Sequence, residues 1–264
     1  MNLDLTGKHA LVGGSSRGIG LATAHELAAL GASVTLLART EASLREALAA
    51  LPTPQRHEGQ THNYCCVDAS DTDALRETVA LLVAAKPVHI LVNNTGGPPP
   101  GPAHTATPEQ YLAAFRQHLL ANQTLATLVI EGMKADGYGR IINIISTSVK
   151  QPLDGLGVSN TVRGAVASWA KTMANELAAF GITVNNVLPG ATRTERLEQI
   201  LTADAAKHGI TREAMATQMQ TAIPMRRFAE AGEVAAAVAF LASPAAAYIT
   251  GINIPVDGGR TKSL

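Results

Sequence analysis

The sequence contains few of the features that mark disulfide-stabilised, metal-binding or membrane proteins. Its two cysteines, Cys65 and Cys66, are adjacent, so a disulfide between them would be badly strained. No Cys/His spacing typical of a metal site occurs, and we expect no bound metal. The longest apolar run, residues 234–242, covers only about half of a membrane span. The composition therefore argues against a small disulfide scaffold and gives no reason to expect a membrane segment.

An excess of one charge and an export signal are also lacking. Lys+Arg and Asp+Glu both number 21, so nothing electrostatic favours nucleic acid or an anionic membrane as the partner. The first residues lack the basic region and apolar core of a secretory signal. With 46% hydrophobic residues among 264, the chain is rich enough for a sizeable core. We expect a soluble, cytoplasmic globular protein.

Short apolar runs alternate with helical patterns along the whole chain, which predicts a mostly parallel sheet with helices on both faces. No composition shift divides the chain, so residues 1–264 are predicted to form one α/β domain, a Rossmann-like, doubly wound parallel sheet. The polar segment 190–225, after Pro189-Gly190, is predicted to be a substrate lid. Strands are expected at 8–13, 33–38, 62–67, 88–93, 140–146, 182–187 and 251–256. Helices are expected at 18–30, 41–51, 71–85 and 107–135. A further helix should carry the apolar stripe from Val162 to Phe180, two more should lie within 195–221, and a last one should precede the final strand.

A glycine-rich turn, residues 13–20 (GGSSRGIG), follows the first expected strand. Glycines let the backbone approach a pyrophosphate at the positive N-terminus of the next helix, although a plain strand–helix turn can look the same. The chain resembles the short-chain dehydrogenase/reductase family over nearly its whole length. The matching motifs are Gly14, Gly18 and Gly20, Asp68 in CVDASD, Asn93-Asn94-Thr95-Gly96 (with Thr for the family's Ala), NNVLPG at 185–190 and GINIPVDGG at 251–259.

The residues after the second expected strand indicate which nicotinamide cofactor binds. In dinucleotide folds, an acid there hydrogen-bonds the ribose 2′-hydroxyl and would repel a 2′-phosphate. This chain has Ala38-Arg39-Thr40 instead, with Arg17 in the glycine loop, so we expect NADP(H) in preference to NAD(H) unless Arg39 is merely a solvated surface residue. With the contacts that the resemblance implies, the predicted cofactor-binding set is Gly14, Ser16, Arg17, Gly18, Ile19, Gly20, Arg39, Thr40, Asp68, Ala69, Asn94, Gly96, Arg163, Pro189, Gly190, Thr192 and Thr194.

At the catalytic positions the chain departs from the family. The resemblance implies a Ser, a Tyr thirteen residues later, a Lys four beyond that, and an Asn on the preceding long helix. Ser146 fits the serine, but Ser159 and Arg163 stand where Tyr and Lys are expected, and His118 stands where Asn is expected. A serine hydroxyl is a far weaker acid than a phenol, whose pKa is about 10, and an arginine cannot shuttle protons.

We therefore predict a rearranged site. Ser146 and Ser159 would hold the substrate oxygen, Arg163 would stabilise negative charge there, and His118 would deliver the proton directly or through water. The alternative is that Ser159 caps its helix, Arg163 is a structural cation and the redox step is lost.

The functional alternatives follow from these departures. They are an NADP(H)-dependent carbonyl reductase or alcohol dehydrogenase similar to 3-oxoacyl-carrier-protein reductases, a protein of non-redox chemistry such as dehydration or epimerisation, and a catalytically inactive binding homologue. The family resemblance implies a small-molecule carbonyl or alcohol substrate and a homo-oligomer, either a dimer or a tetramer.

Overall fold

The predicted architecture is confirmed by a computed structural model that describes residues 1–53 and 59–263. Seven strands form one sheet in which every neighbouring pair is parallel, in the order β3-β2-β1-β4-β5-β6-β7. This is a doubly wound order, in which the direction of winding reverses between β1 and β4. The strands are β1 (His9–Gly13), β2 (Ser33–Ala38), β3 (His62–Cys66), β4 (Ile90–Asn93), β5 (Gly139–Ile144), β6 (Ile182–Pro189) and β7 (Asn253–Val256).

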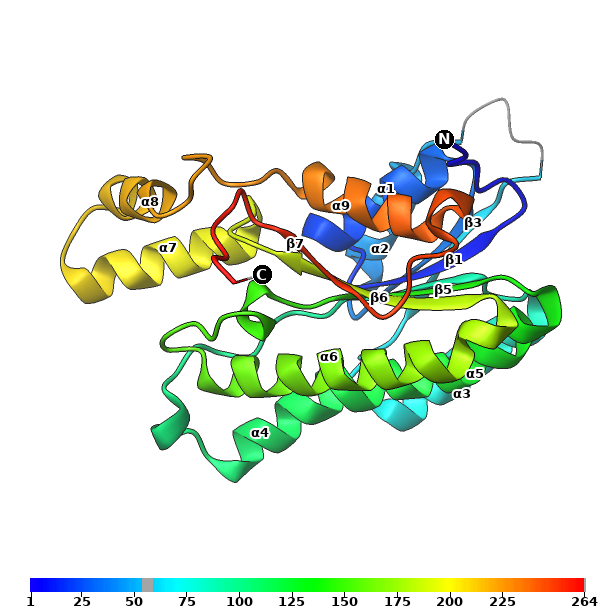
Figure 1. Cartoon of the computed structure of the whole chain (residues 1–264), viewed down its shortest axis with the longest axis horizontal. Helices are drawn as coiled ribbons and strands as arrows, with labels where there is room; N and C mark the ends of the chain where they lie inside the picture. The colour runs from blue at the N-terminus through cyan, green and yellow to red at the C-terminus, as the bar shows by residue number, and fades with distance from the viewer. Residues whose placement is uncertain (54–58, 264) are drawn as a thin grey trace.

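Helices cover both faces of the sheet (Figure 1). One apolar cluster joins one face of the sheet to α1, α2 and α9, and a second joins the opposite face to α3, α5 and α6. Because both faces are covered, the central strands are almost wholly apolar and buried. The helices are α1 (Gly18–Ala29), α2 (Glu41–Ala49), α3 (Thr72–Ala85), α4 (Pro108–Phe115), α5 (Ala121–Asp136), α6 (Gly157–Leu177), α7 (Glu195–His208), α8 (Arg212–Thr221) and α9 (Ala231–Ala242).

The helix expected over 107–135 differs from the prediction in its middle. Thr107 caps its start by accepting a hydrogen bond from the Gln110 amide, and Gly137 ends it in the left-handed conformation. Between α4 and α5, the segment Arg116–Leu120 forms one turn of π-helix. Such a turn inserts an extra residue and is often found at functional sites. Sequence periodicity gave no sign of it, because one wide turn barely disturbs an apolar stripe.

The apolar stripe from Val162 to Phe180 is only partly confirmed as core. Val162, Val166 and Leu177 are buried on α6. Phe180 lies beyond the helix in a short 3-10 turn and is 46% exposed, against the sequence expectation that it continues the buried stripe.

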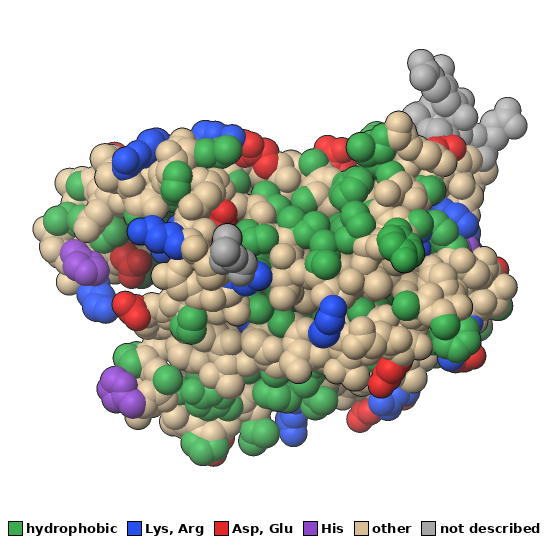
Figure 2. Space-filling view, viewed as in Figure 1, with side chains coloured by type: hydrophobic (Ala, Val, Ile, Leu, Met, Phe, Trp, Pro, Cys, Tyr) green, Lys and Arg blue, Asp and Glu red, His purple; other side chains and the backbone are tan. Residues whose placement is uncertain are grey.

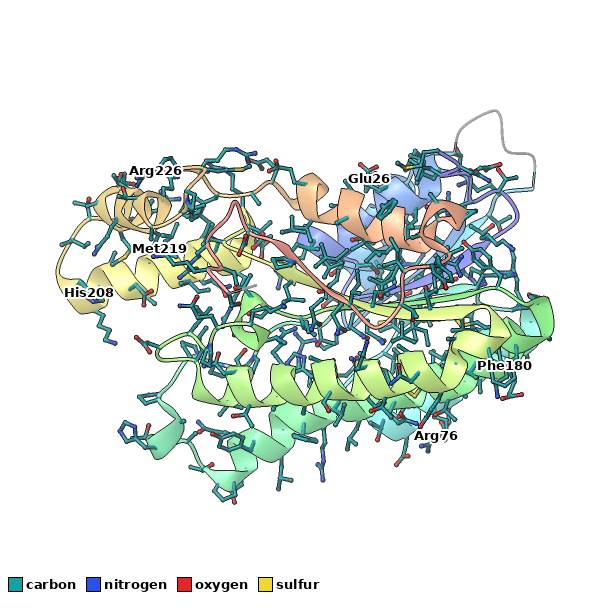
Figure 3. All side chains as sticks on the ribbon, viewed as in Figure 1. Glu26, Arg76, Phe180, His208, Met219 and Arg226 are labelled. Atoms are coloured by element: carbon teal, nitrogen blue, oxygen red, sulfur yellow. The ribbon has the colours of Figure 1, made fainter. Side chains whose placement is uncertain are left out.

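The carboxyl ends of the strands face the lobe formed by α7 and α8. Figure 3 shows this for β6: Phe180, just before the strand begins, and His208, at the end of α7, lie at opposite ends of the molecule, so the strand runs toward the α7–α8 lobe. The two helices project beyond the sheet in Figure 1 and have a small apolar cluster of their own, built around Leu201 and Met215. This arrangement places residues 190–225 next to the edge where ligands bind in open α/β sheets. Within residues 1–53 and 59–263, no helix combines the length and hydropathy needed to cross a bilayer.

Candidate active site

A cleft of about 670 Å³ lies at the carboxyl edge of the sheet, at the point where the winding reverses. Its wall is formed by the glycine loop, the segments that follow β2, β3, β4 and β6, and the first turns of α7. The space-filling view shows an indentation on the left between the α7–α8 lobe and the lobe that carries α4 (Figure 2). Of the predicted cofactor-binding residues, all except Gly20 line this cleft.

The glycine loop has backbone angles and close contacts that leave no room for side chains at its glycines. Gly14 and Gly18 have positive φ angles of 56° and 57°, which favour glycine. A Cβ atom on Gly20 would lie 2.2 Å from the Gly14 carbonyl oxygen, so Gly20 acts in packing behind the loop. The Ser15 hydroxyl accepts a hydrogen bond from the Leu37 amide at 2.9 Å, and the Asn94 side-chain amide donates to the Gly13 oxygen at 3.2 Å. The loop is therefore fixed to β2 and to the end of β4.

The N-terminus of α1 presents positive charge to this cleft. Arg17 occupies the N-cap position without a side-chain cap, and the first turn contains no acidic residue. Free amides and the helix dipole therefore remain available to an anion such as a pyrophosphate. This open N-terminus and the side-chain-free loop fit a dinucleotide.

Two arginines stand in the wall of the cleft, one after β2 and one in the glycine loop. Arg39 follows β2 and lies 3.8 Å from the Asp68 carboxylate, with its own side chain 70% exposed. Arg17 contacts the carboxylate of Glu195, in the first turn of α7. Both cations are exposed enough to exchange these weak surface contacts for a phosphate.

His118 lies in the π-helical turn and is buried, with 3% of its surface exposed. Its Nδ1 atom is 2.6 Å from the Thr95 hydroxyl, in the segment that follows β4. Burial, and then the nearby charge of Arg163, lowers the pKa of His118 to about 3. The ring is therefore neutral at physiological pH. Its buried Nε2 atom has no hydrogen-bond partner among the described residues.

Arg163 is buried on α6 and lines the cleft. Its Nη1 donates to the Ile144 carbonyl oxygen at 2.9 Å, and its buried Nε has no partner within the described chain. Burial lowers the pKa of this guanidinium to about 10, so it still carries its charge near neutral pH. A buried cation that lines a cleft, with a free donor, is suited to a ligand oxygen or anion.

The two serines stand in different situations. The Ser146 hydroxyl accepts a hydrogen bond from the Ser148 amide at 3.1 Å, which leaves its proton free to donate. Ser159 lies inside α6, whose N-cap is Leu156, so the alternative that Ser159 caps this helix is wrong. Ser159 and Arg163 are one turn apart on the helix, whereas Ser146, Ser159 and His118 do not line the 670 Å³ cleft itself.

Sequence reasoning missed several residues that line the cleft, among them Ser43, Thr95, Gly97, Gln117 and Arg196. The Gln117 side-chain amide donates to the Gly96 oxygen at 3.1 Å. Thr95 could have been found, since it departs from the family pattern just as His118 does, and the two departures form one contact. Nothing in the sequence indicated Arg196.

Residues 14–261 match the family profile described as "Enoyl-(Acyl carrier protein) reductase". A monensin polyketide synthase putative ketoacyl reductase from Streptomyces virginiae is 35% identical over 257 residues, which cover 96% of this chain and 97% of the relative.

Two of the most similar solved structures are NADPH complexes. The L-sorbose reductase of Gluconobacter frateurii, complexed with NADPH and L-sorbose, has a TM-score of 0.92 at 30% identity, with both chains fully covered. The actinorhodin polyketide ketoreductase with NADPH has a TM-score of 0.89 at 31% identity, with 97% of each chain covered.

Proposed function

The chain belongs to the short-chain dehydrogenase/reductase family, and on that premise we propose that it is an NADP(H)-dependent oxidoreductase that reduces the carbonyl group of a small molecule, or oxidises the corresponding alcohol. The observation that carries this proposal is the charge of the cleft. The open N-terminus of α1 and two exposed arginines of the cleft wall, Arg17 in the glycine loop and Arg39 after β2, suit a dinucleotide that bears an extra phosphate. The NADPH-bound state of the two structural relatives supports it.

The cofactor would be held along the whole cleft. The glycine loop and α1 would take the pyrophosphate, Arg39 and Thr40 the 2′-phosphate, and Asp68 and Ala69 the adenine. Asn94, Gly96, Pro189, Gly190, Thr192 and Thr194 would form the wall at the nicotinamide end, with Arg163 beside its ribose. When bound, NADPH supplies the hydride for the carbonyl carbon.

The chain's own residues would act on the substrate oxygen. Ser146 can donate a hydrogen bond to that oxygen, because its hydroxyl accepts from the Ser148 amide and keeps its own hydrogen free. Ser159 and Arg163 approach from one face of α6, and the guanidinium stabilises the negative charge that develops as hydride arrives. In the proposed divergent site, serine hydroxyls and a permanent cation thus hold the substrate oxygen in place of a phenol and a lysine, and the proton arrives through a separate relay.

His118 enters this scheme as a neutral group. With a pKa of about 3 it holds no imidazolium proton to give near neutral pH. A neutral imidazole can accept a proton at one nitrogen while it releases one from the other, and Thr95 already occupies one of the two. We therefore assign His118 to a relay through the Thr95 hydroxyl or water, and not to direct donation as an imidazolium.

We also propose that the protein is a homo-oligomer and that residues 190–225 act as a lid. Tyr248, fully exposed at 103%, and Ile252, exposed at 36%, flank the approach to β7 and supply apolar surface for a second copy. The lid proposal rests on the position of α7 and α8 beside the cleft, to which α7 contributes Glu195, Arg196, Leu197 and Ile200.

The test is titration of the purified protein with NADPH and NADH, followed by turnover with a carbonyl panel that includes an acetoacetyl thioester. We expect NADPH to bind at least about tenfold more tightly than NADH, and nicotinamide oxidation to require a carbonyl. Arg39→Ala should remove the preference, while Arg45→Ala, at a neighbouring arginine that pairs with Glu41 outside the cleft, should retain it. Product formed without net oxidation would favour non-redox chemistry, and failure of both nucleotides to bind would refute the proposal.

A further inference from the structure

The cleft contains more positive than negative charge, and the excess is concentrated at one place. The acidic groups of its wall, Asp68 and Glu195, are already engaged by Arg39 and Arg17. A third arginine, Arg193, pairs with Glu230 at 2.9 Å. The two arginines of the wall that have no carboxylate within 4 Å, among residues 1–53 and 59–263, are Arg163 and Arg196.

These two guanidinium groups approach consecutive residues of the loop after β4. A Cβ atom on Gly97 would lie 3.7 Å from Nη2 of Arg163, which comes from α6. The Nη2 atom of Arg196, from the first turn of α7, donates to the Pro98 carbonyl oxygen at 3.2 Å. Two permanent cations from different helices therefore meet the same short stretch of chain.

The first turn of α7 reaches the glycine loop through Glu195, which pairs with Arg17, but Arg196 is directed away from that loop, toward Pro98. Arg39 and the glycine loop lie after β2 and β1, whereas the Gly97-Pro98 stretch follows β4, and α6 follows β5. Arg163 comes from α6, the helix that also carries Ser159, and its Nη1 is bonded to the Ile144 carbonyl oxygen two residues before Ser146, so the charge pair lies beside the groups to which we assign the substrate oxygen. A hydrogen bond to a neutral carbonyl compensates a guanidinium charge only in part.

We infer that the substrate carries its own anionic group, a carboxylate or a phosphate ester, beside the carbonyl that reacts, and that Arg196 is the residue that selects it. This inference rests on the proposed function. The planar guanidinium of Arg196 offers two parallel N–H donors to such a group. Its contact with Pro98 is replaceable, because its side chain belongs to an exposed residue at the rim of the cleft. Arg163 supplies the second positive charge from beneath.

The experiment compares matched charged and neutral carbonyl compounds by calorimetric titration into the protein saturated with NADP⁺. One arm uses straight-chain keto acids, with the ketone at successive positions from the carboxylate, each against its methyl ester. The other uses dihydroxyacetone phosphate against dihydroxyacetone. The arm that shows the larger preference identifies the anion as a carboxylate or a phosphate.

In the wild-type protein, we expect at least one charged compound to bind about tenfold or more tightly than its neutral partner. Arg196→Gln should bring that ratio close to one, and Arg196→Lys should keep part of it. Arg193→Gln is the matched control, since it removes a neighbouring arginine that already has a carboxylate partner, and it should keep the full ratio.

Four results would overturn the inference. In the wild-type protein, these are equal binding of the charged and the neutral compound, or no binding of either. In Arg196→Gln, they are a preference for the charged compound that survives the substitution, or a loss of NADPH affinity as large as the loss of substrate affinity. NADPH binding to the wild-type protein is measured in the same samples. Its absence would refute the proposed function itself, whereas intact NADPH binding without a charge preference would refute only the anionic substrate.

Discussion

At the scale of single residues, the neutral state of His118 decides which proton chemistry this site can perform. The ring is enclosed with Thr95 on one side and near the charge of Arg163, and both burial and that charge disfavour the imidazolium. The ring therefore does not titrate in the pH range where enzymes usually work, which is why we propose a relay for it and not acid catalysis as an imidazolium. Burial also lowers the pKa of Arg163, but only to about 10, so its guanidinium remains charged near neutral pH.

Replacement of His118 should show whether the residue acts as a neutral proton relay or as an acid that titrates. We expect His118→Ala to lower kcat by about a hundredfold or more, because a relay in general acid catalysis contributes about 10²–10⁴ in rate. NADPH affinity should change little, because His118 does not line the cleft. His118→Asn, which keeps hydrogen bonding but cannot titrate, should recover part of the loss. Steady-state kinetics from about pH 5 to 9 check this, and an inflection that is present in the wild type but absent in His118→Asn would contradict the neutral state.

At the scale of elements, the attachment of α7 to the rest of the molecule is the feature with most bearing on function. Thr194 caps α7 by accepting from the Leu197 amide at 3.4 Å, and it also lines the cofactor cleft. Thr211 caps α8 in the same way, through the Ala214 amide at 3.2 Å, but lies outside the cleft. Both helices thus have a threonine N-cap, but only the cap of α7 lies in the cleft.

This pair of caps gives a matched test of the lid. Each Thr→Ala variant should weaken its own helix by about 1 kcal/mol, seen as roughly fivefold faster amide exchange in that helix. Thr194→Ala should also weaken NADPH binding, whereas Thr211→Ala should leave it unchanged. Hydrogen exchange mapped by peptide, with and without NADPH, makes the measurement. If NADPH protects neither helix, residues 190–225 do not act as a lid.

At the scale of the whole molecule, stability should depend on pH through buried neutral histidines. His9 on β1 is 3% exposed, with Nδ1 3.0 Å from the Pro87 carbonyl oxygen and Nε2 2.8 Å from the Thr35 hydroxyl. Burial lowers its pKa to about 4, assisted by the charges of Lys86 and His89. The same direction holds for His118, His62 and His89, in each case chiefly through burial.

The sign follows from proton binding. In the unfolded chain each histidine takes up a proton as the pH falls through about 6.5, whereas folded His9 does so only near its pKa of about 4. The free energy of unfolding should therefore be greatest above that range and fall as pH drops from about 6.5 to 4, by up to about 1.4 kcal/mol per pH unit for each such histidine.

Urea unfolding at a series of pH values checks this expectation. His9→Gln should flatten the decline, because glutamine has no proton to take up in the unfolded state. His104→Gln, at an exposed position in the short helix Ala103–Thr105, serves as the control. A decline that is identical in His9→Gln and the wild type would show that His9 is not the source.

The sequence by itself determined the succession of strands and helices along the chain and the position of the glycine loop between the first strand and the first helix. Runs such as residues 90–93 and 140–144 must be buried on both faces, and Gly14, Gly18 and Gly20 suit a turn that no other residue could make, so local physics sufficed. The ends of strands were less well determined. The strand expected to end at residue 146 ends at Ile144, because the pairing with β6 reaches only one hydrogen bond further, from the Ile145 amide to the Val187 oxygen.

Only the tertiary structure decided the surroundings of the candidate catalytic residues. The π-helical turn at Arg116–Leu120, the contact of His118 with Thr95, and the burial of Arg163 each depend on segments far apart in the chain. So does the meeting of Arg163 and Arg196 at the Gly97-Pro98 loop. A pKa and an unpaired charge are set by the dielectric and the neighbours that packing brings together, and neither can be read from residue types alone.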